Sequence, residues 1–168
     1  NLIPKFDHII IVGGMANNII NFKGNPIGKS IKEDDCDKII DDIFKTAKIH
    51  SCSISYPQDV LVGKSFKDKS QIKEFDEISD DDLILDIGPK TLCKIREIIQ
   101  ISKTILWNGP AGYFENPNFA NGSYEIAKEI IKRNKKNLIY SVAGGGDTIA
   151  VLNQINAVND FNFVSTAG

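Results

Sequence analysis

Short apolar runs of strand length alternate along this chain with stretches of helical periodicity, and this alternation constrains the fold more than any other feature. The runs are rich in Ile, Leu and Val and lie at residues 8–12, 59–62, 83–86, 104–107, 138–142 and 161–165. Runs of this kind are typical of strands buried on both faces, and the intervening helical patterns indicate βαβ units. The sequence therefore predicts an α/β fold, doubly wound, with a mostly parallel six-stranded sheet and helices on both faces, a Rossmann-like three-layer sandwich.

Helical patterns separate several of these runs. Residues 33–48 carry apolar side chains at three- and four-residue steps with acids in the first turns, which indicates an amphipathic helix. Further helices are predicted from Pro89 onward, at 124–131 and at 147–155. Residues 64–82 are polar enough for a long loop or an excursion from the sheet. Because no repeat, low-complexity tract or linker appears, residues 1–168 are interpreted as one domain.

Composition and charge exclude several partners. The formal net charge of -2, with acids and bases interleaved, offers no stripe for a nucleic acid backbone. The longest apolar run is far too short to cross a bilayer, and no charged leader precedes a cleavage site, so we expect a cytoplasmic protein without a membrane partner. We expect a monomer. Because the chain begins at Asn1 rather than Met and stops directly after an apolar run, we also expect it to be part of something longer.

Three glycine-rich segments follow predicted strands. They lie at residues 12–15, 107–112 and 143–148. In an open parallel sheet, ligands bind beyond the carboxyl ends of the strands, where these loops meet. The sequence therefore predicts the functional site at this edge of the sheet.

The strongest signal is the segment 144–148, called here the phosphate loop. Its three glycines expose backbone N–H groups, and the N-terminus of the following helix attracts anionic phosphate. Asp147 adds a carboxylate that could hold Mg²⁺, and Thr148 adds a hydroxyl donor. The alternative is that Asp147 is a helix N-cap and the glycines form a tight turn.

A second group of residues could bind a nucleoside. Glu115 follows the strand that ends at Trp107, and a carboxylate there could accept both hydroxyls of a ribose; the alternative is a plain surface Glu. Phe66 and Leu85 could form an apolar slot for a flat base, although such residues are more often core. Residues 24–30 resemble a P-loop, but only three residues separate the two glycines where four are required, and no strand precedes them.

Several catalytic arrangements are missing from the spacing of the chain. The three cysteines and two histidines are widely spaced and suit neither a disulfide framework nor a metal site, and no Ser/His/Asp set or carboxylate pair can be read. Phosphoryl transfer depends chiefly on positioning and on neutralising charge, so glycine loops and one Mg²⁺ carboxylate are what it would leave in a sequence.

These segments together resemble the phosphoglycerate kinase family across essentially the whole chain. The runs that carry the resemblance are residues 105–115, 144–148 and 164–168, supported by 27–30 and 85–89. The resemblance implies the carboxyl-terminal, nucleotide-binding lobe of a two-lobed glycolytic kinase, which transfers a phosphoryl group between 1,3-bisphosphoglycerate and ADP to give 3-phosphoglycerate and ATP. It implies that 3-phosphoglycerate is bound by an amino-terminal lobe that this chain lacks, so we expect the chain alone to be inactive.

The resemblance also implies roles for individual residues. Those that would border the adenine are Gly13, Gly14, Ile31, Phe66 and Leu85. Those that would hold the nucleoside are Asn108, Pro110, Tyr113 and Glu115. The phosphates of ATP or ADP would be bound by Gly144, Gly145, Gly146, Asp147 and Thr148, with the three glycines acting in catalysis and Asp147 binding Mg²⁺. The sequence departs from the family at Asn17-Asn18, where Thr-Phe is usual, and at Tyr113, where a smaller aliphatic residue is usual.

Two other functions remain to be distinguished. The first is a non-catalytic module that binds adenine nucleotide, which the same loops would serve. The second is an NAD-dependent dehydrogenase domain of similar topology. A dehydrogenase should show a GxGxxG turn after its first strand with an acid about 20 residues later, and Gly13-Gly14-Met15 does not provide it.

Overall fold

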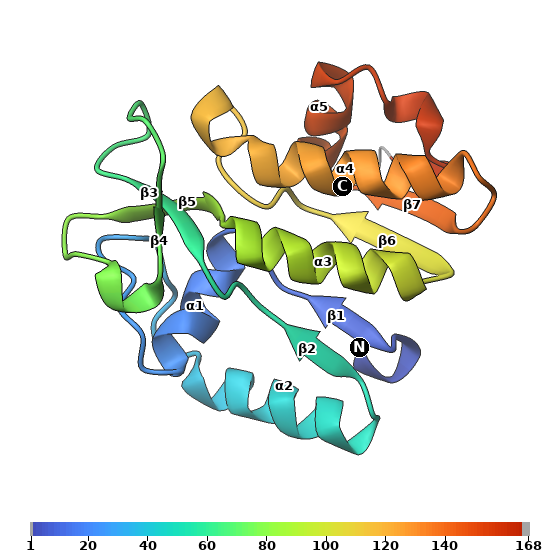
Figure 1. Ribbon diagram of the computed structural model, residues 1–168. Coiled ribbons are helices and arrows are strands. Elements are labelled where there is room, and N and C mark those ends of the chain that lie inside the picture. Colours follow the sequence, from blue (N-terminus) through green and yellow to red (C-terminus); the bar gives the residue numbers. More distant parts are fainter. Residues whose placement is uncertain (1, 166–168) are drawn as a thin grey trace.

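Two parallel ladders form the centre of the molecule. We describe residues 2–165 of a computed structural model, shown in Figure 1. The first ladder pairs β1 (His8–Ile10) with β2 (Ser53–Ser55). The second has the order β6-β7-β8, from β6 (Thr104–Asn108), β7 (Tyr140–Gly144) and β8 (Phe163–Ser165). Parallel strands flanked by helices confirm the predicted α/β class.

The strands near residues 60 and 85 form a separate antiparallel sheet, which corrects the prediction of one six-stranded sheet. Its order is β4-β3-β5, from β4 (Gln71–Lys73), β3 (Val60–Gly63) and β5 (Leu83–Ile87). A parallel pair needs a crossover, usually a helix, but the segment between β3 and β5 holds only β4 and the short 3-10 turn Phe75–Glu77. The excursion predicted for residues 64–82 is therefore this small sheet.

Some strands lie outside the predicted runs or are shifted from them. The sequence patterns do not predict β2 or β4, since each has only three residues and both are partly polar. The strand predicted at 138–142 begins two residues later, at Tyr140. The reason is local: Asn137 has a positive φ, and the Leu138 backbone N–H donates to the Arg133 carbonyl, so this segment still closes the preceding helix.

Five α-helices connect the strands: α1 (Gly14–Phe22), α2 (Asp37–Ile49), α3 (Pro89–Ile101), α4 (Asn121–Asn134) and α5 (Gly146–Gln154), as described within residues 2–165. Pro89 occupies the first turn of α3, as predicted. The residue patterns do not predict α1, which begins at the glycines without a side-chain cap. Helix α2 begins four residues later than predicted because the Glu33 N–H donates to Asn18 Oδ1 at 2.7 Å, which ties this segment to α1.

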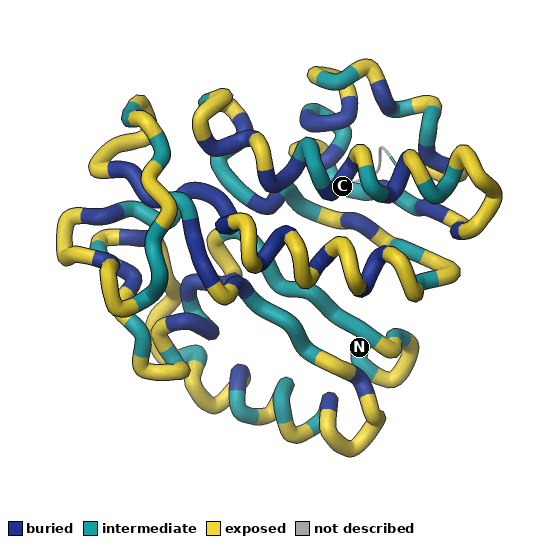
Figure 2. Tube along the Cα trace, viewed as in Figure 1, coloured by how far each residue is buried: buried dark blue, intermediate teal, exposed yellow. Residues whose placement is uncertain are grey.

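The main core lies between the β6-β7 ladder and helices α3, α4 and α5. Trp107 and Ala143 belong to one buried cluster with Leu92 and Ile95 of α3 and Ile130 of α4. Figures 1 and 2 show α3 and α4 on the same face of the sheet, with their buried turns towards the strands and their exposed turns away. This packing fixes the direction of β6 and β7, whose carboxyl ends carry two of the glycine loops.

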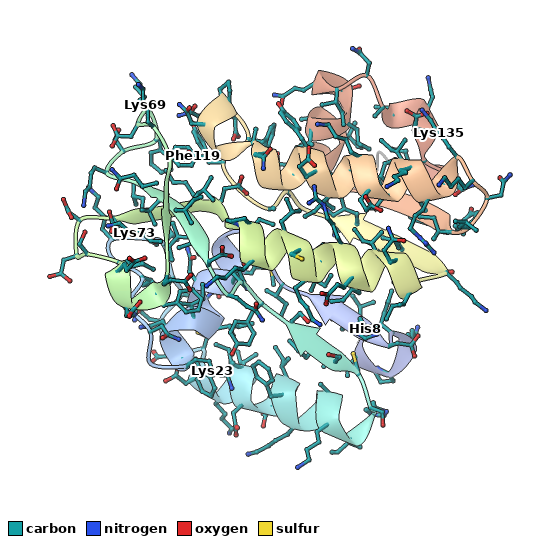
Figure 3. All side chains as sticks on the ribbon, viewed as in Figure 1. His8, Lys23, Lys69, Lys73, Phe119 and Lys135 are labelled. Carbon is teal, nitrogen blue, oxygen red and sulfur yellow. The ribbon has the colours of Figure 1, made fainter. Side chains whose placement is uncertain are left out.

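A second core cluster joins α1 to the antiparallel sheet. It contains Ala16 and Ile20 of α1, Val60 and Val62 of β3, and Ile27 and Ile78 from the connecting segments. The fully buried Phe119 reaches the backbone of Gly63 in β3, so the segment before α4 also packs against this sheet; Figure 3 shows Phe119 beside the antiparallel strands. The antiparallel sheet is therefore held beside the carboxyl edge of the parallel strands.

Candidate functional site

The three glycine segments meet at one edge of the molecule. Asn108, at the end of β6, lies opposite Gly144, at the end of β7. A Cβ added to Gly13 would lie 3.1 Å from the carbonyl oxygen of Pro110, so the segment after β1 approaches the loop after β6. The site predicted from strand order is therefore assembled at the carboxyl ends of β1, β6 and β7.

The phosphate loop has the backbone that its glycines predict. Gly145 has φ +87°, in the region that favours glycine, and a Cβ there would lie 2.5 Å from Asn108 Oδ1. Helix α5 starts at Gly146, and nothing lies within 4 Å of a Cβ added to Gly144 or Gly146, so both glycines border open space. The first-turn N–H groups of α5 have no intrahelical acceptors and can bind an anion.

Asp147 is not the N-cap of α5, so that part of the alternative is wrong. The N-cap position is occupied by Gly145, and no side chain caps the helix. The Asp147 carboxylate is exposed in the first turn of α5. It is therefore accessible to a ligand at the phosphate loop.

The donor set fits Mg²⁺ held mainly by a substrate. Within residues 2–165, no group of three or more His, Cys, Asp or Glu side chains could hold a metal ion. Mg²⁺ in proteins commonly takes one or two carboxylates, with phosphate oxygens and water as its other ligands. The single carboxylate of Asp147 beside an anion-binding loop matches that pattern.

Thr148 joins the phosphate loop to the loop after β6. Its side chain is fully buried, and its Oγ1 accepts a 2.7 Å hydrogen bond from the Gly109 backbone N–H. Gly109 has φ +105°, and its carbonyl accepts a 2.8 Å bond from the Trp107 indole. The two loops are therefore fixed relative to each other. The predicted role of Thr148 as a donor to phosphate stays a prediction.

Residues 108–115, called here the nucleoside loop, are anchored by backbone hydrogen bonds. The Ala111 N–H donates to Ser123 Oγ at 2.8 Å, and the Tyr113 N–H donates to the Leu85 carbonyl at 2.7 Å. Asn108 and Glu115 are exposed at the two ends of this loop. The carboxylate of Glu115 is therefore available to a ligand.

Phe66 and Tyr113 form an aromatic pair at the edge of the antiparallel sheet. Their ring centroids lie 4.9 Å apart with an interplanar angle of 56°. Phe66 is 45% exposed and is not a core residue, whereas Leu85 is 6% exposed and is. Asn116 secures this contact, because its Nδ2 donates to the Phe66 carbonyl at 2.8 Å. A tilted pair of aromatic rings at the nucleoside loop results.

Ile31 is exposed and is tied to α1 through its backbone. Its side chain is 74% exposed, and its carbonyl accepts a 3.0 Å hydrogen bond from Asn17 Nδ2. Asn17 and Asn18 lie on α1, the helix that begins at Gly14. Their hydrogen bonds therefore connect the segment 31–33 to the helix that follows the first glycine segment. The structure thus gives the unusual Asn17-Asn18 pair a structural role.

Several contributors to the site were missed by sequence reasoning. Ser123, Asn116 and Asn17 hold the loops through hydrogen bonds between residues 12 to 50 positions apart in the chain, and no local pattern signals such bonds. Asp86 lies in the 85–89 run, and no sequence pattern indicates that this acid is buried, at 2% exposed. Burial raises the pKa of the Asp86 carboxyl to about 7, although hydrogen bonds from backbone N–H groups oppose the rise.

Two hollows lie apart from the glycine segments: one of about 200 Å³, whose lining includes Lys64 and Lys69, and one of about 630 Å³, whose lining includes Asn18 and Asp37. Neither is lined by a residue of the glycine segments. Thr166, Ala167 and Gly168, which complete the last of the runs quoted above, lie outside the described residues.

None of the helices described within residues 2–165 has both the length and the apolar character that crossing a bilayer requires.

Comparison with known proteins gives a consistent result. The family model described as "Phosphoglycerate kinase" matches residues 1–168. Phosphoglycerate kinases from Zymomonas mobilis and from Wolbachia pipientis are 42% and 41% identical to this chain and align with 100% and 99% of it. The solved structure of phosphoglycerate kinase from Coxiella burnetii superposes with a TM-score of 0.92 at 34% identity and covers 99% of this chain. The chain spans 43% of the length of these two relatives and 42% of that structure.

Proposed function

This chain belongs to the phosphoglycerate kinase family, and from that premise we propose that it is the MgADP- and MgATP-binding part of a phosphotransferase that acts between 1,3-bisphosphoglycerate and ADP. The products are 3-phosphoglycerate and ATP. We propose that the complete enzyme works as a cytoplasmic monomer in glycolysis.

One observation carries the proposal. The hydrogen bond from the Gly109 N–H to Thr148 Oγ1 holds the nucleoside loop and the phosphate loop together at one edge of the sheet. A base and ribose bound at the first loop would direct their phosphates towards the second, where the amide groups at the start of α5 can receive them. The geometry therefore suits a nucleotide rather than a nucleoside or a phosphate alone.

Different residues would bind the base, the sugar and the phosphates. Phe66 and Tyr113 would contact the base, Asn108 and Glu115 the sugar, and residues 144–148 the phosphates. Asp147 would hold Mg²⁺ together with phosphate oxygens, and the bound ion would neutralise phosphate charge. The amide groups of Gly145 and Gly146 would stabilise the negative charge of the transferring phosphoryl group.

The chemistry needs no general base from this chain. In the direction of ATP use, a carboxylate oxygen of 3-phosphoglycerate attacks the terminal phosphorus of ATP, and the bond from that phosphorus to the ADP oxygen breaks. The attacking carboxylate is already ionised at pH 7, since carboxyl groups have a reference pKa near ~4. This matches a site of glycine loops in which the phosphate loop carries one exposed acid, Asp147. We propose that the remaining polypeptide of the complete enzyme binds 3-phosphoglycerate.

Calorimetry of this chain tests the proposal directly. We expect binding of MgADP and MgATP, weaker binding of ADP when Mg²⁺ is removed, and no binding of NAD at the same concentrations. Absence of MgADP binding would contradict the proposal. Tighter binding of NAD than of MgADP would instead favour a dehydrogenase-like module.

A further inference from the structure

A buried carboxyl group lies beneath the nucleoside loop without a role in the reaction described above. Asp86, in β5, is 2% exposed. Among the ion pairs of residues 2–165, none includes Asp86, and its hydrogen-bond donors are backbone N–H groups. Burying an acid without a cation is costly, so an apolar residue would serve the core better. This position calls for a functional explanation.

The contacts of Asp86 point to the loop. Its Oδ2 accepts a 2.8 Å hydrogen bond from the Gly122 N–H, in the first turn of α4, and its Oδ1 accepts one of 2.8 Å from the Ile87 N–H. A Cβ on Gly112 would lie 2.7 Å from both Cα and Cβ of Asp86, and a Cβ on Gly122 would clash with its carboxylate. Asp86 is therefore enclosed between the nucleoside loop on one side and the start of α4 on the other.

The residues next to Asp86 extend this connection along the loop. Ser123, which follows Gly122, accepts the hydrogen bond from the Ala111 N–H, and Leu85, which precedes Asp86, accepts the one from the Tyr113 N–H. Residues 111, 112 and 113 are thus each held by β5 or by the first turn of α4. A change at Asp86 would act first on the middle of the loop, whose hydrogen bonds from residues 111 and 113 go to Ser123 and Leu85 and not to residues 144–148.

We propose that Asp86 is a positioning residue for nucleoside binding, which holds the nucleoside loop between β5 and α4 so that Tyr113 and Glu115 face the ligand. This inference rests on the proposed function, because it assigns Asp86 to the nucleoside half of that site. Asp86 itself touches no ligand. Its effect on binding is exerted through Gly112, Gly122 and Ser123.

Asp59 provides a matched control, because it is the same kind of group at the start of another helix. It is 1% exposed, and its carboxylate accepts hydrogen bonds from the N–H groups of Lys90 and Thr91 in the first turn of α3. Asp59 makes no contact with the nucleoside loop or the phosphate loop among its described hydrogen bonds. Replacing Asp59 tests the loss of a buried helix-capping acid without disturbing the site.

The experiment compares two probes, MgADP and magnesium pyrophosphate, with thermal unfolding measured for every variant. We expect Asp86→Ala to weaken MgADP binding about tenfold, which corresponds to about 1.4 kcal/mol, and to leave pyrophosphate binding unchanged. Asp86→Asn retains an acceptor for the Gly122 N–H and should restore most of the MgADP affinity. Asp59→Ala should lower the unfolding temperature and leave both affinities unchanged. Ser123→Ala, a milder change, should also weaken MgADP alone if Asp86→Ala does not fold.

Each outcome bears on the inference. If Asp86→Ala and Ser123→Ala weaken both probes equally, or if Asp59→Ala weakens MgADP as strongly as Asp86→Ala, Asp86 is only structural and the inference is wrong, while the proposed function stands. If the wild-type chain binds pyrophosphate but not MgADP, the nucleoside half of the proposed function fails and the inference falls with it.

Discussion

The single exposed carboxylate of the phosphate loop should account for much of the metal dependence of binding. We predict that Asp147→Ala weakens MgADP by roughly 1–3 kcal/mol, as expected for the loss of hydrogen bonds and contacts to a charged group. Binding of ADP without Mg²⁺ should change much less. Asp37→Ala is the matched control, because Asp37 is also an exposed acid in the first turn of a helix. Unchanged MgADP affinity in calorimetry would remove Asp147 from the metal site.

Glu115 should contribute to binding of the sugar rather than of the phosphates. We predict that Glu115→Gln weakens MgADP roughly tenfold, since a charged hydrogen-bond acceptor contributes about 1.5–3 kcal/mol. An ADP analogue that lacks both ribose hydroxyls should bind the wild type and the variant alike. Glu97→Gln, on the exposed face of α3, is the control. Equal losses for both nucleotides would contradict the ribose assignment.

The positions of individual site residues could be predicted where the backbone alone determines them. The glycines of residues 144–146 and the position of Asp147 at a helix start follow from chain order and turn chemistry, and the structure has that geometry. Leu85, by contrast, is buried in the core, and its predicted contact with a base stays a prediction. Side-chain bonds across long sequence separations, such as Asn116 to Phe66, depend on packing that no local pattern contains.

At the scale of elements, the antiparallel sheet depends on a buried ion-pair cluster. Asp82 is fully buried, and its carboxylate oxygens lie 2.7 Å from Lys73 Nζ and 2.9 Å from Lys64 Nζ. Burial opposes ionisation of Asp82, but the lysines and the Ser79 backbone outweigh it and hold the pKa of this carboxyl well below its ordinary value. The stabilisation from a lowered pKa is present above about pH 4 and is lost as the pH falls further.

We therefore predict that Asp82→Asn lowers the free energy of unfolding by about 3 kcal/mol, because it removes one partner of a buried ion pair. Asp81→Asn should have no measurable effect, since Asp81 also pairs with Lys64 but is exposed. Urea denaturation at pH 7 measures both. Equal losses for the neighbouring variants would mean that burial of Asp82 is unimportant.

The junction of β5 with α4 should make stability depend on pH near neutrality. Burial raises the pKa of Asp86 to about 7, above its unfolded value of about 4, so the folded state takes up a proton first as the pH falls. The stabilisation is complete below about pH 4 and is lost as the pH rises through about 7. We predict that wild-type stability falls by about 2–4 kcal/mol between pH 5 and pH 8 and that Asp86→Asn reduces this slope. Urea midpoints across that range measure it, and parallel slopes would refute the prediction.

Element order was more predictable than element pairing. The helices from Pro89, near 124–131 and at 147–155 lie close to their predicted places because their apolar periodicity reports directly on the face that packs. The strands at residues 60 and 85 look the same in sequence as parallel ones, since both kinds are short and apolar. Their pairing depends on the connection between them and on the Asp82 cluster, which is visible only in three dimensions.

At the scale of the whole molecule, one face of the larger parallel ladder carries exposed apolar side chains. Leu106, Val142 and Phe163 are neighbours in register across β6, β7 and β8, and Leu106 and Phe163 are 45% and 54% exposed. The opposite face carries Trp107 and packs on α3 and α4. Parallel sheets are normally covered on both faces, and the relatives of this chain are more than twice as long. The described residues thus provide helices for only one face of this ladder.

The last prediction concerns activity. We expect the chain of 168 residues to bind MgADP weakly and to transfer no phosphoryl group between ATP and 3-phosphoglycerate. Transfer requires reacting atoms held about 3–3.5 Å apart in a site closed to water, whereas Gly144 and Gly146 of the phosphate loop border open space. A substrate with both a carboxylate and a phosphate also needs a cluster of cations, whereas the phosphate loop offers backbone amides and the exposed acid Asp147.

A coupled assay on the chain, purified free of host kinase, measures this directly. A longer polypeptide that includes the remainder found in the relatives should show turnover within the usual range of about 1–10³ s⁻¹, and Asp147→Ala should reduce it. The same substitution in the short chain should change binding only. Turnover by the short chain at such rates would mean that the acceptor site lies within these residues. It would contradict the proposal that the remaining polypeptide binds 3-phosphoglycerate.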